Sequence, residues 1–272
     1  GSYNTMTECL KWKRWVINPD PQVEEIFEYV EECDDFYRQP RQYNYLIENK
    51  KQYGKETTKE IIQGYTAKRK TTLRVNTIKS NIKEIKDELE KEKVKYEQVT
   101  WSKDAIIIKN ADEKAIQEME IYKKGKIYMQ SLSSMLPPII LEPKEGTDIL
   151  DMAAAPGGKT TQIAALTNNK AHITACEKNK IRAERLKYNV DKQGASCVFI
   201  MTKDARYIDD FFSFDQILLD APCSGEGRFV ATKVQTYRGW SEKTVNDLVK
   251  LQKKLFESAY KALKHGGVMV YS

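Results

Sequence analysis

The sequence holds little of what metal sites, disulfide frameworks and membrane spans are built from. Two histidines in 272 residues are too few for a His-based metal site, so no metal is expected. The five cysteines are odd in number and scattered, which predicts reduced thiols. No apolar run approaches the roughly 18 residues of a membrane helix, and the N-terminus has no signal-peptide pattern. We therefore expect a soluble, cytoplasmic and monomeric protein with no membrane partner.

Charge is spread unevenly over the first quarter of the chain. Residues 1–37 hold three basic and nine acidic side chains, whereas residues 38–74 hold ten basic and three acidic ones, a net charge of +7. Basic side chains interleaved with aromatic rings can neutralise phosphates and stack on unpaired bases. The alternative is a solvated surface whose tyrosines are partly core. The tyrosines in or beside the basic stretch are Tyr37, Tyr43, Tyr45, Tyr53 and Tyr65.

The pattern of apolar residues divides the chain near residue 143. We expect a helical segment over 1–70, acidic and then basic, and a small α+β RNA-binding module over 71–143. A helix around residues 130–136 should end at Pro137-Pro138, because proline cannot continue a helix. The strands of the module are predicted at 71–79, 96–101 and 105–109, with Ser80 capping a helix after the first strand.

From residue 144 the sequence predicts an α/β domain. Short apolar strands alternate with helices, which indicates a parallel, doubly wound sheet that binds ligands at the carboxyl ends of its strands. Gly194 follows one helix and Gly266-Gly267 another, as helix stop signals. The strands are predicted at 148–153, 172–177, 197–201, 214–220 and 268–271, and the helices at 160–166, 180–193 and 242–263.

A loop of small residues, Asp151-Met-Ala-Ala-Ala-Pro-Gly-Gly-Lys-Thr160, follows the first strand of this sheet. Small residues let a ligand approach the backbone at a helix N-terminus. The loop is one glycine short of a phosphate-binding P-loop, but Pro156 lacks an N–H that a phosphate cradle would use. Glu177 after the second strand could bind ribose hydroxyls, and Asp204 after the third could accept from an adenine amino group. A nucleoside cofactor explains all three strand ends.

The fourth strand leads into a second loop with reactive side chains, Asp220-Ala-Pro-Cys-Ser-Gly-Glu-Gly227. The structural alternative for Cys223 is a small buried residue. Cytosine C5 can attack a methyl group only after a thiolate adds to C6 with a proton donor at N3. A base must then remove the C5 proton. Asp220 and Cys223 supply two of the groups that this chemistry needs around a flipped base.

Four segments together resemble the Nop/Sun family of S-adenosylmethionine-dependent RNA cytosine-5 methyltransferases. They are Arg74-Val-Asn-Thr77, Tyr128-Met-Gln-Ser-Leu-Ser-Ser134, Asp151–Thr160 and Asp220-Ala-Pro-Cys-Ser-Gly225, and the likeness covers roughly residues 70–272. It implies a Rossmann-like methyltransferase sheet, S-adenosylmethionine as the cofactor, and rRNA or tRNA as the substrate. The implied cofactor contacts are Ala153, Ala154, Ala155, Pro156, Gly157, Gly158, Lys159, Glu177, Arg182, Asp204 and Asp220.

The resemblance also implies roles for the second loop. Asp220 would lie near cytosine N3 and Cys223 would release the product. In DNA cytosine-5 enzymes a Pro-Cys cysteine is instead the nucleophile, so that role is the alternative for Cys223. In the RNA family the nucleophile belongs to a Thr-Cys pair after a strand that ends like Val270-Tyr-Ser272. Because the sequence stops at Ser272, we expect a catalytic domain over 144–272 that is truncated at its C-terminus and lacks the last two strands of the usual sheet.

Two functions follow from these patterns. The first is an RNA (cytosine-5-)-methyltransferase that works through a covalent cysteine–C6 adduct in rRNA or tRNA processing. Residues 1–272, without the Thr-Cys pair, should bind cofactor better than they turn over. The alternative is a non-catalytic RNA-binding or ribosome assembly factor that keeps the fold and the cofactor pocket.

Overall fold

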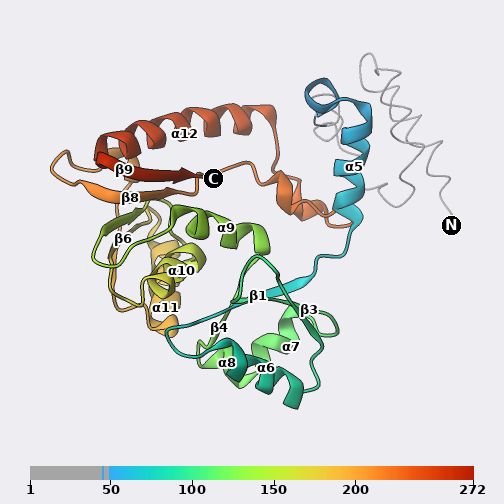
Figure 1. Cartoon of the computed structure of the whole chain (residues 1–272). Helices are drawn as coiled ribbons and strands as arrows, with labels where there is room; N and C mark the ends of the chain where they lie inside the picture. Colours follow the sequence, from blue (N-terminus) through green and yellow to red (C-terminus); the bar gives the residue numbers. More distant parts are fainter. Residues whose placement is uncertain (1–44, 46–48) are drawn as a thin grey trace, which may run out of the picture. The chain divides into compact units, whose positions relative to one another are not determined.

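The computed structural model describes Tyr45 and residues 49–272 (Figure 1). The chain forms two compact units. The smaller unit contains the described residues up to Arg69 together with Cys223–Val249, and the larger contains Lys70–Pro222 with Lys250–Ser272. Helix α5 (Lys55–Thr66) belongs to the smaller unit. The predicted acidic stretch 1–37 lies outside the described residues. The sequence did not predict that residues 223–249 would group with an N-terminal segment.

The first part of the larger unit is a four-stranded antiparallel sheet in the order β2-β3-β1-β4. The chain runs strand–helix–strand, then strand–helices–strand, which is a ferredoxin-like arrangement. Ile85, Leu89 and Ile116 from its helices are fully buried against the sheet. Its elements are β1 (Thr71–Val75), α6 (Ile82–Lys91), β2 (Tyr96–Gln98), β3 (Ala105–Ile108), α7 (Glu113–Glu118), α8 (Glu120–Lys123) and β4 (Ile127–Met129).

Strand β1 ends four residues earlier than the predicted strand over 71–79. The side chain of Asn76 ends it, because its Oδ1 accepts from the backbone N–H of Ile78 at 3.1 Å and so forms a local turn. Helix α6 is then capped by Asn81, whose side chain accepts from the N–H of Glu84 at 3.0 Å. The prediction that Ser80 is the cap was therefore wrong. Its hydroxyl donates to the Glu84 carboxylate instead.

Helix α9 (Leu132–Leu141) continues through Pro137 and Pro138, so the predicted stop at these residues was also wrong. A proline at position 138 leaves the carbonyl of Ser134 without its helical N–H donor. The Gln130 side-chain amide donates to that carbonyl at 3.0 Å. The two prolines are buried, and the helix ends at Glu142 in a left-handed conformation.

The second part of the larger unit is a five-stranded parallel sheet in the order β7-β6-β5-β8-β9. This Rossmann-like methyltransferase sheet confirms the predicted fold class. Gly194 ends α11 in a left-handed conformation, as predicted. Its elements are β5 (Asp148–Asp151), α10 (Gly158–Leu166), β6 (His172–Cys176), α11 (Lys180–Gln193), β7 (Val198–Met201), the short helix η2 (Ala205–Tyr207), β8 (Phe214–Leu219), α12 (Glu242–Ala262) and β9 (Leu263–Tyr271).

Helices cover both faces of the parallel sheet. One face packs on α9, α10 and α11 through buried residues such as Leu141, Ile163 and Leu186. The other packs on the C-terminal part of α12 through Leu255 and Ala259. Figure 1 shows β8 and β9 side by side beneath α12. Burial on both faces explains why the strands read as apolar runs rather than as alternating patterns.

Strand β9 is longer than the predicted strand over 268–271. It begins at Leu263, directly after α12, and includes Gly266 and Gly267, which therefore do not act as a separate stop after the helix. A Cβ on Gly267 would lie 2.8 Å from the carbonyl oxygen of Asp215. The register between β8 and β9 shifts at Phe214/Gln216. Here Gly267 allows a close approach between neighbouring strands.

Gly125 lies where the ferredoxin-like domain meets α11. Its φ is +70°, and a Cβ would lie 2.1 Å from the carbonyl oxygen of Lys192. Gly146 has a similar φ of +75° but nothing within 4 Å of its Cβ position. An added side chain would therefore strain the backbone at both glycines, but it would meet a neighbouring atom only at Gly125.

Gly125→Ala should lower the free energy of unfolding by about 2–4 kcal/mol, since left-handed strain and overpacking add. Gly146→Ala should lower it by only about 1 kcal/mol through strain alone. Urea denaturation of the two variants beside the parent protein measures the difference. Equal losses would show that the contact with Lys192 relaxes without cost.

Candidate active site

Acidic side chains gather at the carboxyl edge of the parallel sheet, where the strand ends meet. Asp151 ends β5, Glu177 follows β6, Asp204 follows β7 and Asp220 follows β8. Two hollows lie at this edge, and Ala153 lines both. The edge is where an open α/β sheet binds ligands.

Ten of the eleven residues predicted to contact the cofactor line one hollow or the other. The larger hollow, of about 200 Å³, is lined by residues 153–156, 158, 159 and 220. The smaller takes Ala153, Glu177, Arg182 and Asp204. Gly157 lines neither; its φ is +109°, and a Cβ there would lie 3.1 Å from Leu186. It shapes the turn into α10 instead of facing a hollow.

Arg182 connects the acid of the second strand to the small-residue loop. Its guanidinium lies 3.3 Å from a carboxylate oxygen of Glu177 and donates to the carbonyl oxygen of Ala155 at 2.9 Å. The other Glu177 oxygen accepts from the backbone N–H of Asn179 at 2.8 Å. Glu177 is buried, so these bonds fix its carboxylate beside the hollow.

Asp204 is held by a partner that the sequence reasoning missed. The Arg206 guanidinium donates to both carboxylate oxygens, at 2.6 to 3.1 Å. This hydrogen bonding lowers the pKa of Asp204 below its usual value. The Asp-x-Arg spacing was the available signal, because a two-residue separation lets the side chain reach back over the 3₁₀ turn η2.

Asp220 receives hydrogen bonds from two sides. Lys159 Nζ lies 2.6 Å from its Oδ2, and Ser272 Oγ donates to its Oδ1 at 2.9 Å. Backbone hydrogen bonds also join the ends of β8 and β9: Ala221 N–H donates to the carbonyl oxygen of Ser272, and Ser272 N–H donates to the carbonyl oxygen of Leu219. The small-residue loop, the end of β8 and the end of β9 thus meet at one carboxylate.

Asp151 is almost completely buried, at 1% exposure, and lines the larger hollow. Its Oδ2 accepts from Thr160 Oγ1 at 2.7 Å, whereas Oδ1 has no hydrogen-bond partner among the described residues. The pKa of Asp151 is raised to about 6, mainly by burial and also by the nearby Asp220, while the hydrogen bond from Thr160 and the charge of Lys159 oppose the rise. A buried oxygen without a donor can accept one from a ligand.

Residues of the ferredoxin-like domain also reach the site, which the sequence analysis did not foresee. Tyr128, Gln130, Ser131 and Ser134 line the larger hollow. These residues belong to a segment that carried the family resemblance, but the reasoning gave them no role. Their position on a strand and a helix start beside the parallel sheet was not readable from sequence.

Arg74 of β1 lies behind this wall and is 3% exposed. It donates to Gln130 Oε1 at 2.9 Å, to Thr161 Oγ1 at 3.0 Å and to the carbonyl oxygen of Gly158 at 3.4 Å. No carboxylate forms an ion pair with it among the described residues, and burial lowers its pKa to about 10. It joins the ferredoxin-like sheet to the first turn of α10.

Cys223 is exposed and belongs to the smaller unit, three residues after Asp220. Cys176 is buried, which raises the pKa of its thiol to about 12 and makes it unreactive at neutral pH. The exposure of Cys223 disfavours its reading as a small buried core residue.

The tyrosines of the basic stretch differ in their surroundings. Tyr45 and Tyr65 pack with Phe229 in a cluster of rings, with centroids 5.6 Å from the Phe229 ring in both cases. Tyr53 is 49% exposed. The structural alternative is thus correct for Tyr45 and Tyr65. Tyr37 and Tyr43 lie outside the described residues.

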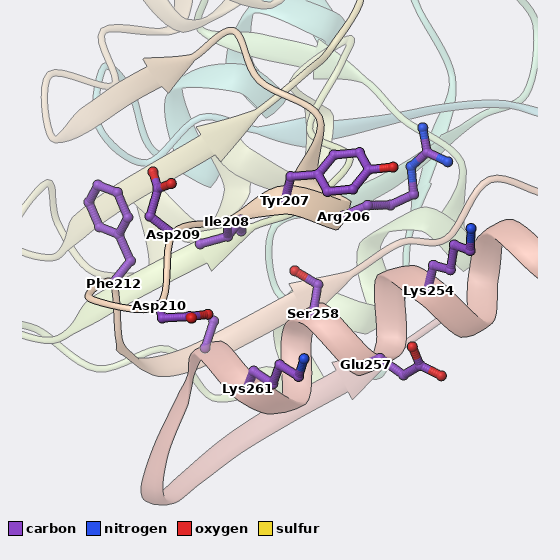
Figure 2. A pocket seen from close by; sticks show the side chains of 11 residues that line it. Arg206, Tyr207, Ile208, Asp209, Asp210, Phe212, Lys254, Glu257, Ser258 and Lys261 are labelled. Atoms are coloured by element: carbon purple, nitrogen blue, oxygen red, sulfur yellow. The ribbon is translucent and has the colours of Figure 1, made fainter.

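A further hollow of about 720 Å³ lies between residues 206–212 and α12 (Figure 2). Ser258 of α12 donates to the carbonyl oxygen of Ala205 at 2.7 Å across its floor. Basic and acidic side chains line it in equal number, and its Arg206 is already bound to Asp204. None of the predicted site residues lines it, so we place the candidate site at the sheet edge.

Within Tyr45 and residues 49–272, no group of three or more His, Cys, Asp or Glu side chains is arranged to hold a metal ion. Over the same residues, no helix combines the length and apolar character that crossing a membrane requires.

Two family models match the chain. The model described as 16S rRNA methyltransferase RsmB/F matches residues 138–272. The model described as the ferredoxin-like domain of RsmF/B-like methyltransferases matches residues 44–113.

Curated relatives carry RNA methyltransferase names. A tRNA (cytosine(49)-C(5))-methyltransferase of Pyrococcus abyssi is 43% identical over 203 residues, which are 74% of this chain and 64% of the relative. A ribosomal RNA small subunit methyltransferase F of Shewanella loihica is 38% identical over 208 residues, 74% of this chain and 43% of the relative. The chain thus spans less than two thirds of these relatives.

Solved structures agree with the fold. NSun6 from Pyrococcus horikoshii with SFG has a TM-score of 0.73 at 25% identity, covering 83% of this chain and 81% of that one. A methyltransferase homolog protein from Pyrococcus horikoshii has a TM-score of 0.73 at 28% identity, covering 93% and 77%.

The raised pKa of Asp151 predicts a pH-dependent stability. Because the folded pKa of about 6 exceeds the ordinary 3.8, the folded state binds the proton more tightly, and stability falls as pH rises between these values. Asp151→Asn cannot ionise. Its free energy of unfolding, relative to the parent protein, should therefore rise by about 1 kcal/mol between pH 5 and pH 8.

Urea denaturation at the two pH values measures this difference. Asp191→Asn, on α11 and remote from the hollow, is the control and should show no such change. A constant difference for Asp151→Asn would mean that the carboxyl group ionises as easily in the folded chain as in the unfolded one.

Proposed function

Because this chain belongs to the RsmB/F family of methyltransferases, we propose that it transfers a methyl group from S-adenosylmethionine to C5 of a cytosine in rRNA or tRNA. The observation that carries the proposal is the single sheet edge shared by the small-residue loop, Glu177, Asp204 and Asp220. The names of the relatives support both the reaction and the RNA classes. A cytoplasmic location and a monomeric state belong to the same proposal.

The residues at this edge fit a nucleoside cofactor. A related structure carries SFG, an analogue of S-adenosylmethionine. Glu177 and Asp204 line one hollow and can accept from ribose hydroxyls and an adenine amino group. The unpartnered Oδ1 of Asp151 and the backbone of residues 153–159 line the other. When bound, the cofactor would supply the methyl group as an electrophile.

Asp220 and Cys223 would act on the cytosine. In the proposed reaction a thiolate forms a bond to C6, and the electron pair displaced from the C5–C6 bond moves towards N3, where Asp220 stabilises the added proton. C5 then takes the methyl group. Removal of the C5 proton re-forms the C5=C6 double bond as the C6–S bond breaks and the thiolate leaves; loss of the N3 proton then returns the ring to its aromatic form. Cys223 is proposed to serve this release, with the Thr-Cys pair of the family supplying the nucleophile.

The parts of the chain are proposed to divide the work. The ferredoxin-like domain within residues 71–143 would contact RNA, together with the basic part of residues 1–70. Residues 144–272 would hold the cofactor and the reacting base. Arg69 of the basic stretch is partly committed to structure, since it donates to the carbonyl oxygen of Gly227 at 2.9 Å. Lys68 and Lys70 are better candidates for phosphate contacts.

Binding of S-adenosylhomocysteine should be measurable by calorimetry and unaffected by EDTA. Asp204→Ala should weaken it by about tenfold or more, because a charged acceptor is lost. Glu184→Ala, on the exposed side of α11, is the control and should bind as the parent protein does. Absence of heat with this ligand, together with tight binding of Mg-ATP, would favour the phosphate-loop alternative instead.

The two roles of Cys223 predict opposite results. Residues 1–272 are joined to a C-terminal segment of the family that carries the Thr-Cys pair, and the protein is incubated with RNA and cofactor. If Cys223 releases product, Cys223→Ala accumulates a covalent RNA–protein adduct on a denaturing gel. If Cys223 is the nucleophile, the same change abolishes the adduct. Neither adduct nor methyl transfer in any variant, with RNA binding intact, would favour the non-catalytic assembly factor.

A further inference from the structure

The smaller unit contains a hollow of about 560 Å³ that plays no part in the proposed chemistry. Its lining comes from two parts of the chain that are distant in sequence: Tyr45, Asn49, Gln52 and Tyr53 on one side, and residues between 226 and 246 on the other. None of the residues predicted for catalysis or cofactor binding belongs to it. Its lining combines aromatic rings with side-chain amides and carboxylates, which is unusual for a purely structural void.

The rings form a rigid floor and an accessible rim. Tyr45 and Trp240 are buried and meet edge to face, with their centroids 5.1 Å apart. The Trp240 indole N–H donates to Glu226 at 2.8 Å, which fixes the ring. Tyr53 is half exposed at the opening. A flat ligand can therefore stack on Tyr53 without rearranging the floor.

Several polar groups of the lining make no hydrogen bond with the described residues. Glu226 Oε1 accepts from Ser224 and from Trp240, while its Oε2 has no partner among the described residues. Gln52, Glu242 and Asn246 also make no hydrogen bond or ion pair with any described residue. The hollow thus offers both amide donors and carboxylate acceptors to a ligand.

We propose that this hollow binds one unpaired nucleobase of the RNA, and that it prefers bases with an exocyclic amino group over uracil. The inference rests on the proposed function, since it assumes an RNA substrate. Stacking on an aromatic ring and hydrogen bonds to the base edge are how proteins recognise splayed-out bases. Carboxylates accept from amino and imino N–H groups but repel the two carbonyl oxygens of uracil.

The polar groups of the lining favour a nucleobase over a cationic ligand. Rings and carboxylates alone would also suit a quaternary ammonium group. However, the side-chain amides of Gln52 and Asn246 can donate to the carbonyl oxygens and ring nitrogens of a base, whereas a quaternary ammonium group has no acceptor for them.

The hollow also connects to the loop that carries Cys223. Glu226 lies three residues after Cys223, and Ser224 between them donates to its carboxylate at 2.5 Å. A base bound at Glu226 would hold a nucleotide close, along the chain, to the proposed release cysteine. The hollow would then help to select the sequence next to the target cytosine.

The test measures binding of fluorescent 12-nucleotide single-stranded oligouridylates that carry G, A, C or U at one central position. The three amino-bearing oligomers should bind the parent protein more tightly than the all-uridine one. Tyr53→Ala should weaken the best of them by about tenfold, the loss of one stacked base, and Tyr53→Phe should restore the affinity. Glu242→Gln should reduce the preference over uridine. Tyr260→Ala, at an even more exposed tyrosine of the larger unit, is the control.

Each outcome decides the proposal. Equal affinities for Tyr53→Ala and Tyr260→Ala, with RNA still bound, would overturn the base site and leave the proposed methyltransferase intact. No RNA binding by the parent protein, despite binding of S-adenosylhomocysteine, would overturn both the base site and the proposed substrate. Binding of choline that Tyr53→Ala abolishes, without any effect on RNA, would assign the hollow to cationic ligands.

Discussion

The larger unit depends on the buried guanidinium of Arg74, which has no carboxylate of the described residues within ion-pair distance. A guanidinium removed from water costs several kcal/mol unless its donors are satisfied. Arg74 meets that requirement only with acceptors from both domains, Gln130 on one side and Thr161 and Gly158 on the other. The ferredoxin-like sheet and the first turn of α10 are therefore stable in this arrangement together. Any ligand at the small-residue loop binds to a surface that the neighbouring domain helps to hold in place.

Glutamine amides extend the same constraint. Gln130 binds Arg74 through its oxygen and donates to Ser134 and Gln162 through its nitrogen. Gln162 in turn donates a hydrogen bond to the carbonyl oxygen of Met135 in α9. Gln130 thus supplies the donor that Pro138 cannot, Gln162 adds a second bond to the helix backbone, and α9 continues across the prolines. A short helix that would be marginal by itself is stabilised through its neighbours rather than by its own backbone.

Periodicity, helix stop signals and strand order correctly predicted the features that depend on nearby residues. The five parallel strands, the left-handed Gly194 and the gathering of Glu177, Asp204 and Asp220 at one edge follow from periodicity and topology. The predictions failed at Pro138, where the Gln130 side chain supplies the missing donor, and at Ser80, where the neighbouring Asn81 caps the helix instead. The wall formed by Tyr128 and Ser134 could not be predicted, because it requires the position of one domain against another. The partner of Asp204 was within reach, two residues along the chain.

The pairing of β8 with β9 sets where the chain leaves the sheet. The hydrogen bonds of Ser272 to Leu219 and Ala221 are fixed by strand register, and its hydroxyl touches the Asp220 carboxylate. The residue directly after β9 therefore lies next to the Asp220 carboxylate, whatever its side chain. The separation between groups on these two loops is governed by the spacing of adjacent strands, about 4.8 Å, which loop sequence cannot alter. Substitutions can therefore change the chemistry at this edge, but they leave the spacing between the two strand ends unchanged.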